Sequence, residues 1–168
     1  MSQRTIARAL ISVYYKDNLE PIIHTLAKNG VEFVSTGGTQ EFIEKLGYGV
    51  TPVEKLTGYP SIFGGRVKTL HPAVFGGILY RREDKSDVAQ AAEFQIGPLD
   101  LVIVDLYPFE ETVAKGGSDD DIIEKIDIAA SPSSEAQPKT STMCLSSRHA
   151  RSTASCCSCC KRKRVSPI

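Results

Sequence analysis

Four side chains with complementary chemistry lie within six residues of one another, directly after a pair of glycines. Residues 64–72 read GGRVKTLHP and contain Arg66, Lys68, Thr69 and His71. Glycines let backbone N–H groups approach a ligand, a guanidinium can bind a planar oxyanion through two parallel hydrogen bonds, and lysine adds a mobile positive charge. A solvated basic loop without a ligand is the simpler alternative. The composition of the run favours an anion-binding loop.

A second glycine pair lies in the run STGGT at residues 35–39, between a predicted strand and a predicted helix. The N–H groups and the dipole at the start of such a helix point beyond the edge of the sheet, where α/β proteins bind phosphate. The alternative is a plain turn in which glycine only supplies a positive φ. Ser12 and Lys16 follow the first predicted strand and would lie beside the same point. The two runs together predict a phosphate site.

The elements that must position these residues can be predicted from apolar patterns. Residues 9–13, 32–35 and 99–106 are apolar and rich in β-branched side chains, which is typical of buried parallel strands. Apolar stripes at helical spacing predict helices over 18–28 and 39–46, each ended by a glycine, and further helices are expected over 87–94 and 119–126. Alternating strands and helices predict an α/β fold with an open, doubly wound, mostly parallel sheet. Residues 57–75 are expected to form a functional loop.

Composition divides the chain into two parts. Residues 1–128 contain 13 basic and 19 acidic side chains, whereas residues 129–168 contain 7 basic and 1 acidic. All five cysteines lie in the second part, and no aromatic residue follows Phe109. Such a segment has too little apolar surface to offset its ordering entropy, so we expect residues 129–168 to be disordered. Its adjacent cysteines lack the spacing of a zinc site, and we expect no metal.

The GGRVKTLHP run resembles the signature of the bifunctional purine-biosynthesis enzyme AICAR transformylase/IMP cyclohydrolase, in its amino-terminal cyclohydrolase domain. Four further stretches agree with this family in the same order, namely ALISV at 9–13, STGGT at 35–39, DLYPF at 105–109 and IDI at 126–128. The resemblance covers residues 7–128. It implies a methylglyoxal-synthase-like fold and the closure of the formamido imidazole carboxamide ribotide (FAICAR) to inosine monophosphate (IMP), with loss of water.

The resemblance also implies roles for individual residues. Lys68, Tyr107 and Asp127 would be catalytic, while the phosphate and substrate would be held by Ser12, Lys16, Thr36, Gly37, Gly38, Thr39, Arg66 and Thr69. The sequence departs from the family at Tyr14-Tyr15 and Asp17-Asn18, where many members have Ser-Asp and Thr-Gly. Asp105 stands where some relatives have asparagine.

Beyond Ile128 the resemblance stops, and a frameshift would explain why. A gene encoding GGISLIRGAAKN, read after deletion of one G, can encode AASPSSEAQPKT, which are residues 129–140 of this chain. We therefore expect an incomplete cyclohydrolase domain over residues 1–128, followed by an out-of-frame tail. The folate-dependent transformylase domain, which uses 10-formyltetrahydrofolate, would be absent, as would a lysine that completes the family's cyclohydrolase site. Catalysis by this chain is accordingly expected to be weak.

The remaining expectations concern ligands and location. The cyclohydrolase step implied by the resemblance needs no cofactor, and its ligand is a ribonucleotide, FAICAR or IMP. No apolar run reaches the roughly 20 residues of a membrane span and no signal peptide is apparent, so we expect a cytoplasmic protein that binds neither membrane nor nucleic acid. The family forms homodimers. A phosphate-ligand regulatory module and methylglyoxal synthase share the predicted fold and remain alternatives.

Overall fold

A single parallel sheet forms the centre of the molecule. The computed structural model describes residues 5–65, 67–105, 109–124 and 143–146. The strands are β1 (Arg8–Ser12), β2 (Glu32–Ser35), β3 (Val50–Pro52), β4 (Leu101–Val104) and β5 (Met143–Ser146). They lie in the order β3-β2-β1-β4-β5, and all neighbouring pairs are parallel. The chain builds the sheet outward from β1 through β2 to β3 and then returns to the other side of β1, so the order reverses between β1 and β4.

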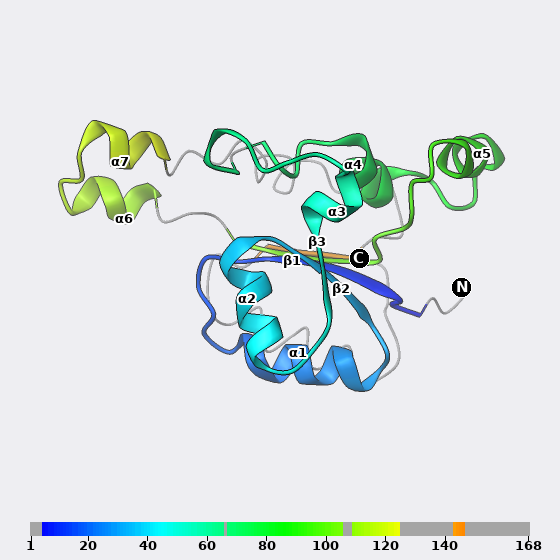
Figure 1. The fold of residues 1–168 in the computed structure, drawn as a ribbon, viewed down its shortest axis with the longest axis horizontal. Coiled ribbons are helices and arrows are strands. Elements are labelled where there is room, and N and C mark those ends of the chain that lie inside the picture. The colour runs from blue at the N-terminus through cyan, green and yellow to red at the C-terminus, as the bar shows by residue number, and fades with distance from the viewer. Residues whose placement is uncertain (1–4, 66, 106–108, 125–142, 147–168) are drawn as a thin grey trace.

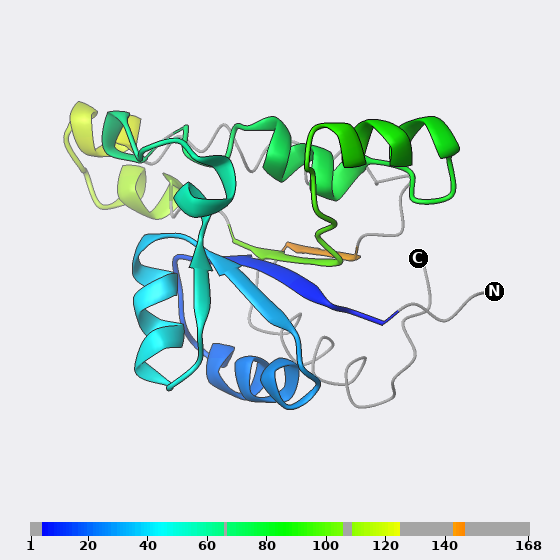
Figure 2. The ribbon, with the colours of Figure 1, turned by 45° about the vertical axis from the view of Figure 1, so that its right-hand side comes forward.

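Helices cover both faces of this sheet (Figures 1 and 2). Helices α1 (Leu19–Lys28) and α2 (Gly37–Lys45) lie on one face, whereas α3 (Val53–Thr57) and α4 (Pro72–Leu79) lie on the other. Helix α5 (Lys85–Glu93) follows α4, and α6 (Phe109–Ala114) with α7 (Asp119–Glu124) lies toward one end of the molecule. The arrangement confirms the predicted open, doubly wound α/β fold. None of the described helices is both long and apolar enough to cross a lipid bilayer.

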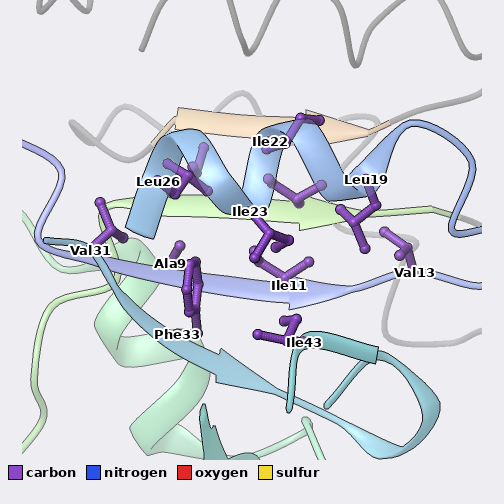
Figure 3. Close-up of a cluster of buried hydrophobic side chains, with 12 residues drawn as sticks. Ala9, Ile11, Val13, Leu19, Ile22, Ile23, Leu26, Val31, Phe33 and Ile43 are labelled. Atoms are coloured by element: carbon purple, nitrogen blue, oxygen red, sulfur yellow. The ribbon is translucent and has the colours of Figure 1, made fainter. Parts of the chain in front are cut away.

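Two apolar cores hold the helices to the sheet. The first fills the space beneath α1 and α2, where Leu19, Ile22, Ile23 and Leu26 of α1 meet β1 side chains such as Ile11 (Figure 3). The second lies beneath α3 and α4 and includes Val53, Val74, Leu99 and Val102. Alternate residues of each strand point to opposite faces, and Leu10 accordingly belongs to the second core while Ile11 belongs to the first.

The amino-terminal ends of β1 and β4 are joined by Asp100. Its carboxylate accepts hydrogen bonds from the backbone N–H groups of Ala7 and Arg8, both at 2.9 Å. It also forms an ion pair with Arg82, whose guanidinium donates a second hydrogen bond to the Leu99 carbonyl at 2.9 Å. Both charged side chains are largely buried, so this contact fixes how the two central strands begin.

The structure differs from the sequence-based predictions in several elements. Strand β3 was not predicted, and α4 begins at Pro72, so it takes up the last four of residues 57–75, where a loop was expected. Helix α2 begins at Gly37, two residues earlier than predicted. Within residues 129–168, which we expected to be disordered, Met143–Ser146 form β5 and pair with β4. The expectation therefore does not hold for those four residues, and the rest of that segment lies outside the described residues.

Candidate functional site

The carboxyl ends of β1 and β2 meet the start of α2, and hydroxyl groups join the three elements. Ser12, the last residue of β1, shares a hydrogen bond of 2.7 Å with Thr36, the residue that precedes α2. The neighbouring Ser35 is buried, and its hydroxyl donates to the Ile11 carbonyl at 2.6 Å. The Thr36 hydroxyl does not cap the helix, because it is directed to Ser12 instead. Sequence-distant residues of the predicted phosphate site are thus in direct contact.

Thr39, in the first turn of α2, binds the segment that follows β1. Its hydroxyl donates to the Val13 carbonyl at 2.9 Å and accepts from the Val13 N–H at 3.1 Å. The side chain is 2% exposed, so both hydrogen bonds are shielded from water. The Thr39 hydroxyl proton is donated to the Val13 carbonyl and is therefore not available to a ligand. In this structure Thr39 fixes Val13 and with it the segment that leads to Lys16.

Two lysines approach the start of α2 from different parts of the chain. A Cβ atom built on Gly38 would lie 3.9 Å from the Lys16 ammonium, and one built on Gly37 would lie 3.6 Å from the Lys68 ammonium. Lys68 also lies close to Gly65, where a Cβ would be 3.2 Å from its nitrogen. Two positive charges beside the positive end of a helix dipole make a site for an anion.

Glycine is required at two of these positions for conformation as well as for space. Gly37 has a φ of +41° and Gly65 a φ of +85°, both in the region that disfavours L side chains. Gly65 also has the Ser61 hydroxyl 3.1 Å from where a Cβ would lie. Any larger residue at Gly65 would therefore be strained and would press on both Ser61 and Lys68.

Asp105 closes the site on the side of β4. One carboxylate oxygen accepts the Tyr14 N–H at 2.5 Å, and the other accepts the Tyr15 N–H at 3.1 Å. Burial raises the pKa of the Asp105 carboxyl above its ordinary value, against the opposing effects of these two hydrogen bonds and of the Lys16 charge. Asp105 thus ties the carboxyl end of β4 to the segment that leads to Lys16.

The structure brings together seven of the predicted site residues, which are Ser12, Lys16, Thr36, Gly37, Gly38, Thr39 and Lys68. Thr69 lies in the same loop as Lys68, and its carbonyl accepts the His71 N–H at 2.8 Å. Arg66, Tyr107 and Asp127 lie outside the described residues, so their roles stay predictions. The roles of the seven in ligand binding also stay predictions, although their proximity is now established.

Sequence reasoning treated Asp105 as a simple variant and passed over Ser61. An acidic residue directly after a strand that borders the reversal in strand order is a signal that could have identified Asp105. No comparable signal marks Ser61, since its proximity to Lys68 depends on the turn at Gly64 and Gly65. The His71 ring nitrogen accepts the Ala73 N–H at 3.1 Å and caps α4, so His71 orders the loop that precedes this helix.

Comparison with known proteins finds sequences that are similar over most of this chain. It is 62% identical over 125 residues to the bifunctional purine biosynthesis protein PurH of Bacteroides thetaiotaomicron, covering 74% of this chain and 25% of that protein. It is 50% identical to PurH of Corynebacterium glutamicum over 126 residues, and this match covers 75% of this chain and 24% of that protein. The chain therefore spans about a quarter of the length of these relatives.

Solved structures and family comparison agree with this result. The crystal structure of ForH superposes with a TM-score of 0.66 at 29% sequence identity, covering 92% of this chain and 76% of that one. The MGS-like domain family matches residues 18–131. These matches confirm the resemblance found in the sequence motifs. The chain belongs to the MGS-like domain family.

Proposed function

We propose that this chain is an IMP cyclohydrolase domain of purine nucleotide biosynthesis, which binds the ribonucleotides FAICAR and IMP. The observation that supports this most is the placement of the Lys16 and Lys68 ammonium groups at the start of α2, beside Gly38 and Gly37. A nucleotide's 5′-phosphate is a dianion of the size such a site accommodates. The purine-biosynthesis relatives named above support the choice of nucleotide.

The reaction needs a donor for one oxygen and an acceptor for one proton. The carboxamide nitrogen attacks the formyl carbon, a carbon–nitrogen bond forms, and the formyl oxygen takes up protons and leaves as water. Lys68 is suited to stabilise the developing negative charge on that oxygen, because its ammonium lies beside the start of α2. In this proposal Tyr107 supports Lys68, Asp127 holds and deprotonates the amide, and Arg66 binds the substrate.

Several finer features belong to the same proposal. The cyclohydrolase step uses no cofactor, the protein is cytoplasmic, and two copies form a homodimer as in the family. Turnover by this chain is weak, since the sequence after Ile128 lacks the lysine that completes the family's site. Loss of one preorganised donor commonly lowers the rate by about 10²–10³. Steady-state assay of FAICAR closure measures this, and normal turnover would contradict it.

Calorimetric titration with IMP tests the binding proposal. We expect IMP to bind the unaltered chain and Lys16→Ala to weaken binding by roughly 10- to 100-fold, the usual value of a charge-assisted hydrogen bond. Lys28→Ala is the matched control, because Lys28 is an exposed lysine at the end of α1. Its affinity should equal that of the unaltered chain.

Measurement of the melting temperature with different ligands separates the alternatives. A methylglyoxal synthase would be stabilised by a triose phosphate, and a regulatory module of this fold by ligands such as uridine nucleotides. Thermal stabilisation by one of these and none by IMP would reject the cyclohydrolase proposal.

A further inference from the structure

We propose that Asp105 is a positioning residue for the phosphate site, holding residues 14–16 so that the Lys16 ammonium stays beside Gly38. The inference uses the proposed function only in assuming that Lys16 binds the ligand's phosphate. Asp105 itself touches no ligand in this proposal. Its carboxylate acts through the backbone of the segment that carries the lysine.

The location of Asp105 in the sheet makes such a role possible. It directly follows β4, whose last residue, Val104, lies opposite Ser12 of β1. The order of the strands reverses between β1 and β4, and in open α/β sheets the crevice beyond such a reversal is where ligands bind. Asp105 joins β4 to the segment after β1 at this reversal, since its two oxygens accept the consecutive N–H groups of Tyr14 and Tyr15.

The backbone of residues 13 and 14 also holds the Lys16 side chain in place. The Lys16 ammonium donates to the carbonyl oxygens of Val13 and Tyr14, both at 2.9 Å, so the side chain folds back along the residues that precede it. Thr39 fixes Val13 from α2, and Asp105 fixes Tyr14 from β4. An ammonium has three donors, and two carbonyl bonds leave one proton that can be donated to a phosphate oxygen.

The two hydrogen bonds by which Asp105 holds the Tyr14 and Tyr15 N–H groups, here called the clamp, require the ionised form of Asp105. A carboxylate is a strong acceptor at both oxygens, whereas the neutral acid carries a proton on one of them, which makes that oxygen a weaker acceptor for its N–H group. Among the described residues, the charged group that acts on Asp105 is Lys16, and the phenols of Tyr14 and Tyr15 belong to the clamped segment itself. Acidification should therefore weaken these hydrogen bonds.

The variant Asp105→Asn tests the proposal, because its amide nitrogen is a donor and cannot accept the second N–H. We expect its affinity for inorganic phosphate and for IMP to fall by roughly tenfold. Asp17→Asn is the matched control for charge, since Asp17 is an exposed acid of the same segment. Removing its negative charge should leave affinity unchanged or slightly raised. Equal affinities for Asp105→Asn and Asp17→Asn would overturn the proposal.

A second control separates positioning from general stability. Asp100→Asn loosens the same strand pair at its opposite end, so it should lower the melting temperature while leaving phosphate affinity unchanged below that temperature. Should Asp100→Asn weaken phosphate binding as much as Asp105→Asn does, the effect would be one of stability, and the positioning role would be rejected.

The unaltered chain offers a readout that needs no variant. The amide protons of Tyr14 and Tyr15 are expected to shift together in NMR spectra on acidification, with a midpoint above the ordinary aspartate pKa of 3.8. The ratio of phosphate affinities between the unaltered chain and Asp105→Asn should fall over the same pH interval. Amide shifts that do not titrate in this interval would overturn the clamp.

These outcomes are distinct from failure of the proposed function. If the unaltered chain binds inorganic phosphate but not IMP, the cyclohydrolase proposal fails while the positioning role of Asp105 can still be measured with phosphate. If IMP binds and Asp105→Asn binds it equally well at all pH values, the cyclohydrolase proposal stands and the positioning role is rejected. A chain that binds neither ligand contradicts both.

Discussion

The hydroxyl of Thr39 donates to and accepts from one residue, Val13, and both hydrogen bonds lie in the interior. Replacement by valine conserves shape but leaves the Val13 N–H without this partner. An unsatisfied buried donor costs about 1–3 kcal/mol, so we expect Thr39→Val to lower the free energy of unfolding by that amount. Urea denaturation measures the change.

Thr39→Ser is the matched control, because it keeps the hydroxyl and removes only a methyl group. It should retain most of the stability that valine loses. If serine and valine destabilise equally, the methyl group contributes as much to stability as the hydroxyl does, and the prediction that the hydrogen bonds dominate is contradicted.

For individual residues, the sequence indicated which residue types belong to the candidate site more fully than it indicated which atoms contact one another. The runs STGGT and GGRVKTLHP pointed to glycine, hydroxyl and lysine because each of these has a chemical reason to lie near a phosphate. The Asp105 clamp could not be predicted in detail, since its partners are backbone N–H groups 90 and 91 residues away. Backbone partners leave no trace in residue types.

Helix α4 depends on close packing that only glycine permits. A Cβ atom on Gly77 would lie 2.6 Å from the Gly97 carbonyl oxygen, and one on Gly76 would lie 3.0 Å from the Ile96 side chain. Backbone cannot yield as a flexible side chain does, so Gly77→Ala must displace α4 from residues 97–99. Overpacking of this kind costs about 1–3 kcal/mol, which we expect as a lowered free energy of unfolding.

Gly49→Ala serves as the control for this prediction, because no atom lies within 4 Å of a Cβ built there. Its stability should be within about 0.5 kcal/mol of the unaltered chain, as for most surface changes. A loss in Gly77→Ala as small as that in Gly49→Ala would show that helix α4 can move away from residues 97–99, contrary to the packing described here.

The same elements show why part of the fold escaped prediction. Strands β1, β2 and β4 are mostly buried, and each contains at least two consecutive apolar residues, which fits the pattern of a central parallel strand. Strand β3 has only three residues, all partly buried, and ends in proline, so it has neither the length nor the pattern of a strand. Helix α4 contains two glycines, and its low helix propensity is offset by packing that sequence patterns do not reveal.

The architecture of the whole molecule explains why the site forms at one edge. All strands are parallel, so their carboxyl ends lie together and bring Ser12, Thr36 and Asp105 to one side of the sheet. Alternation of strands and helices was sufficient to predict this arrangement. Composition was not sufficient to predict β5, because residues 129–168 lack the aromatic residues and continuous apolar runs that mark a core strand.

Strand β5 forms one edge of the sheet, and its contribution to the whole molecule can be tested through its backbone. Leu145 lies opposite Ile103 and Cys144 opposite Val102, in parallel register. Successive N–H groups of a strand point in opposite directions, so one of these two residues directs its N–H to β4 and the other away from it. Proline has no N–H and removes a ladder hydrogen bond only where one is made.

Cys144→Pro and Leu145→Pro should therefore have unequal effects. The variant that removes the N–H facing β4 should lower the free energy of unfolding by about 1–3 kcal/mol and speed hydrogen exchange in β4, while the other should change both less. The two variants control for each other, since each introduces the same ring into adjacent positions of the same strand. Equal exchange rates in β4 for both variants and the unaltered chain would mean that β4, rather than β5, is the edge of the sheet in solution.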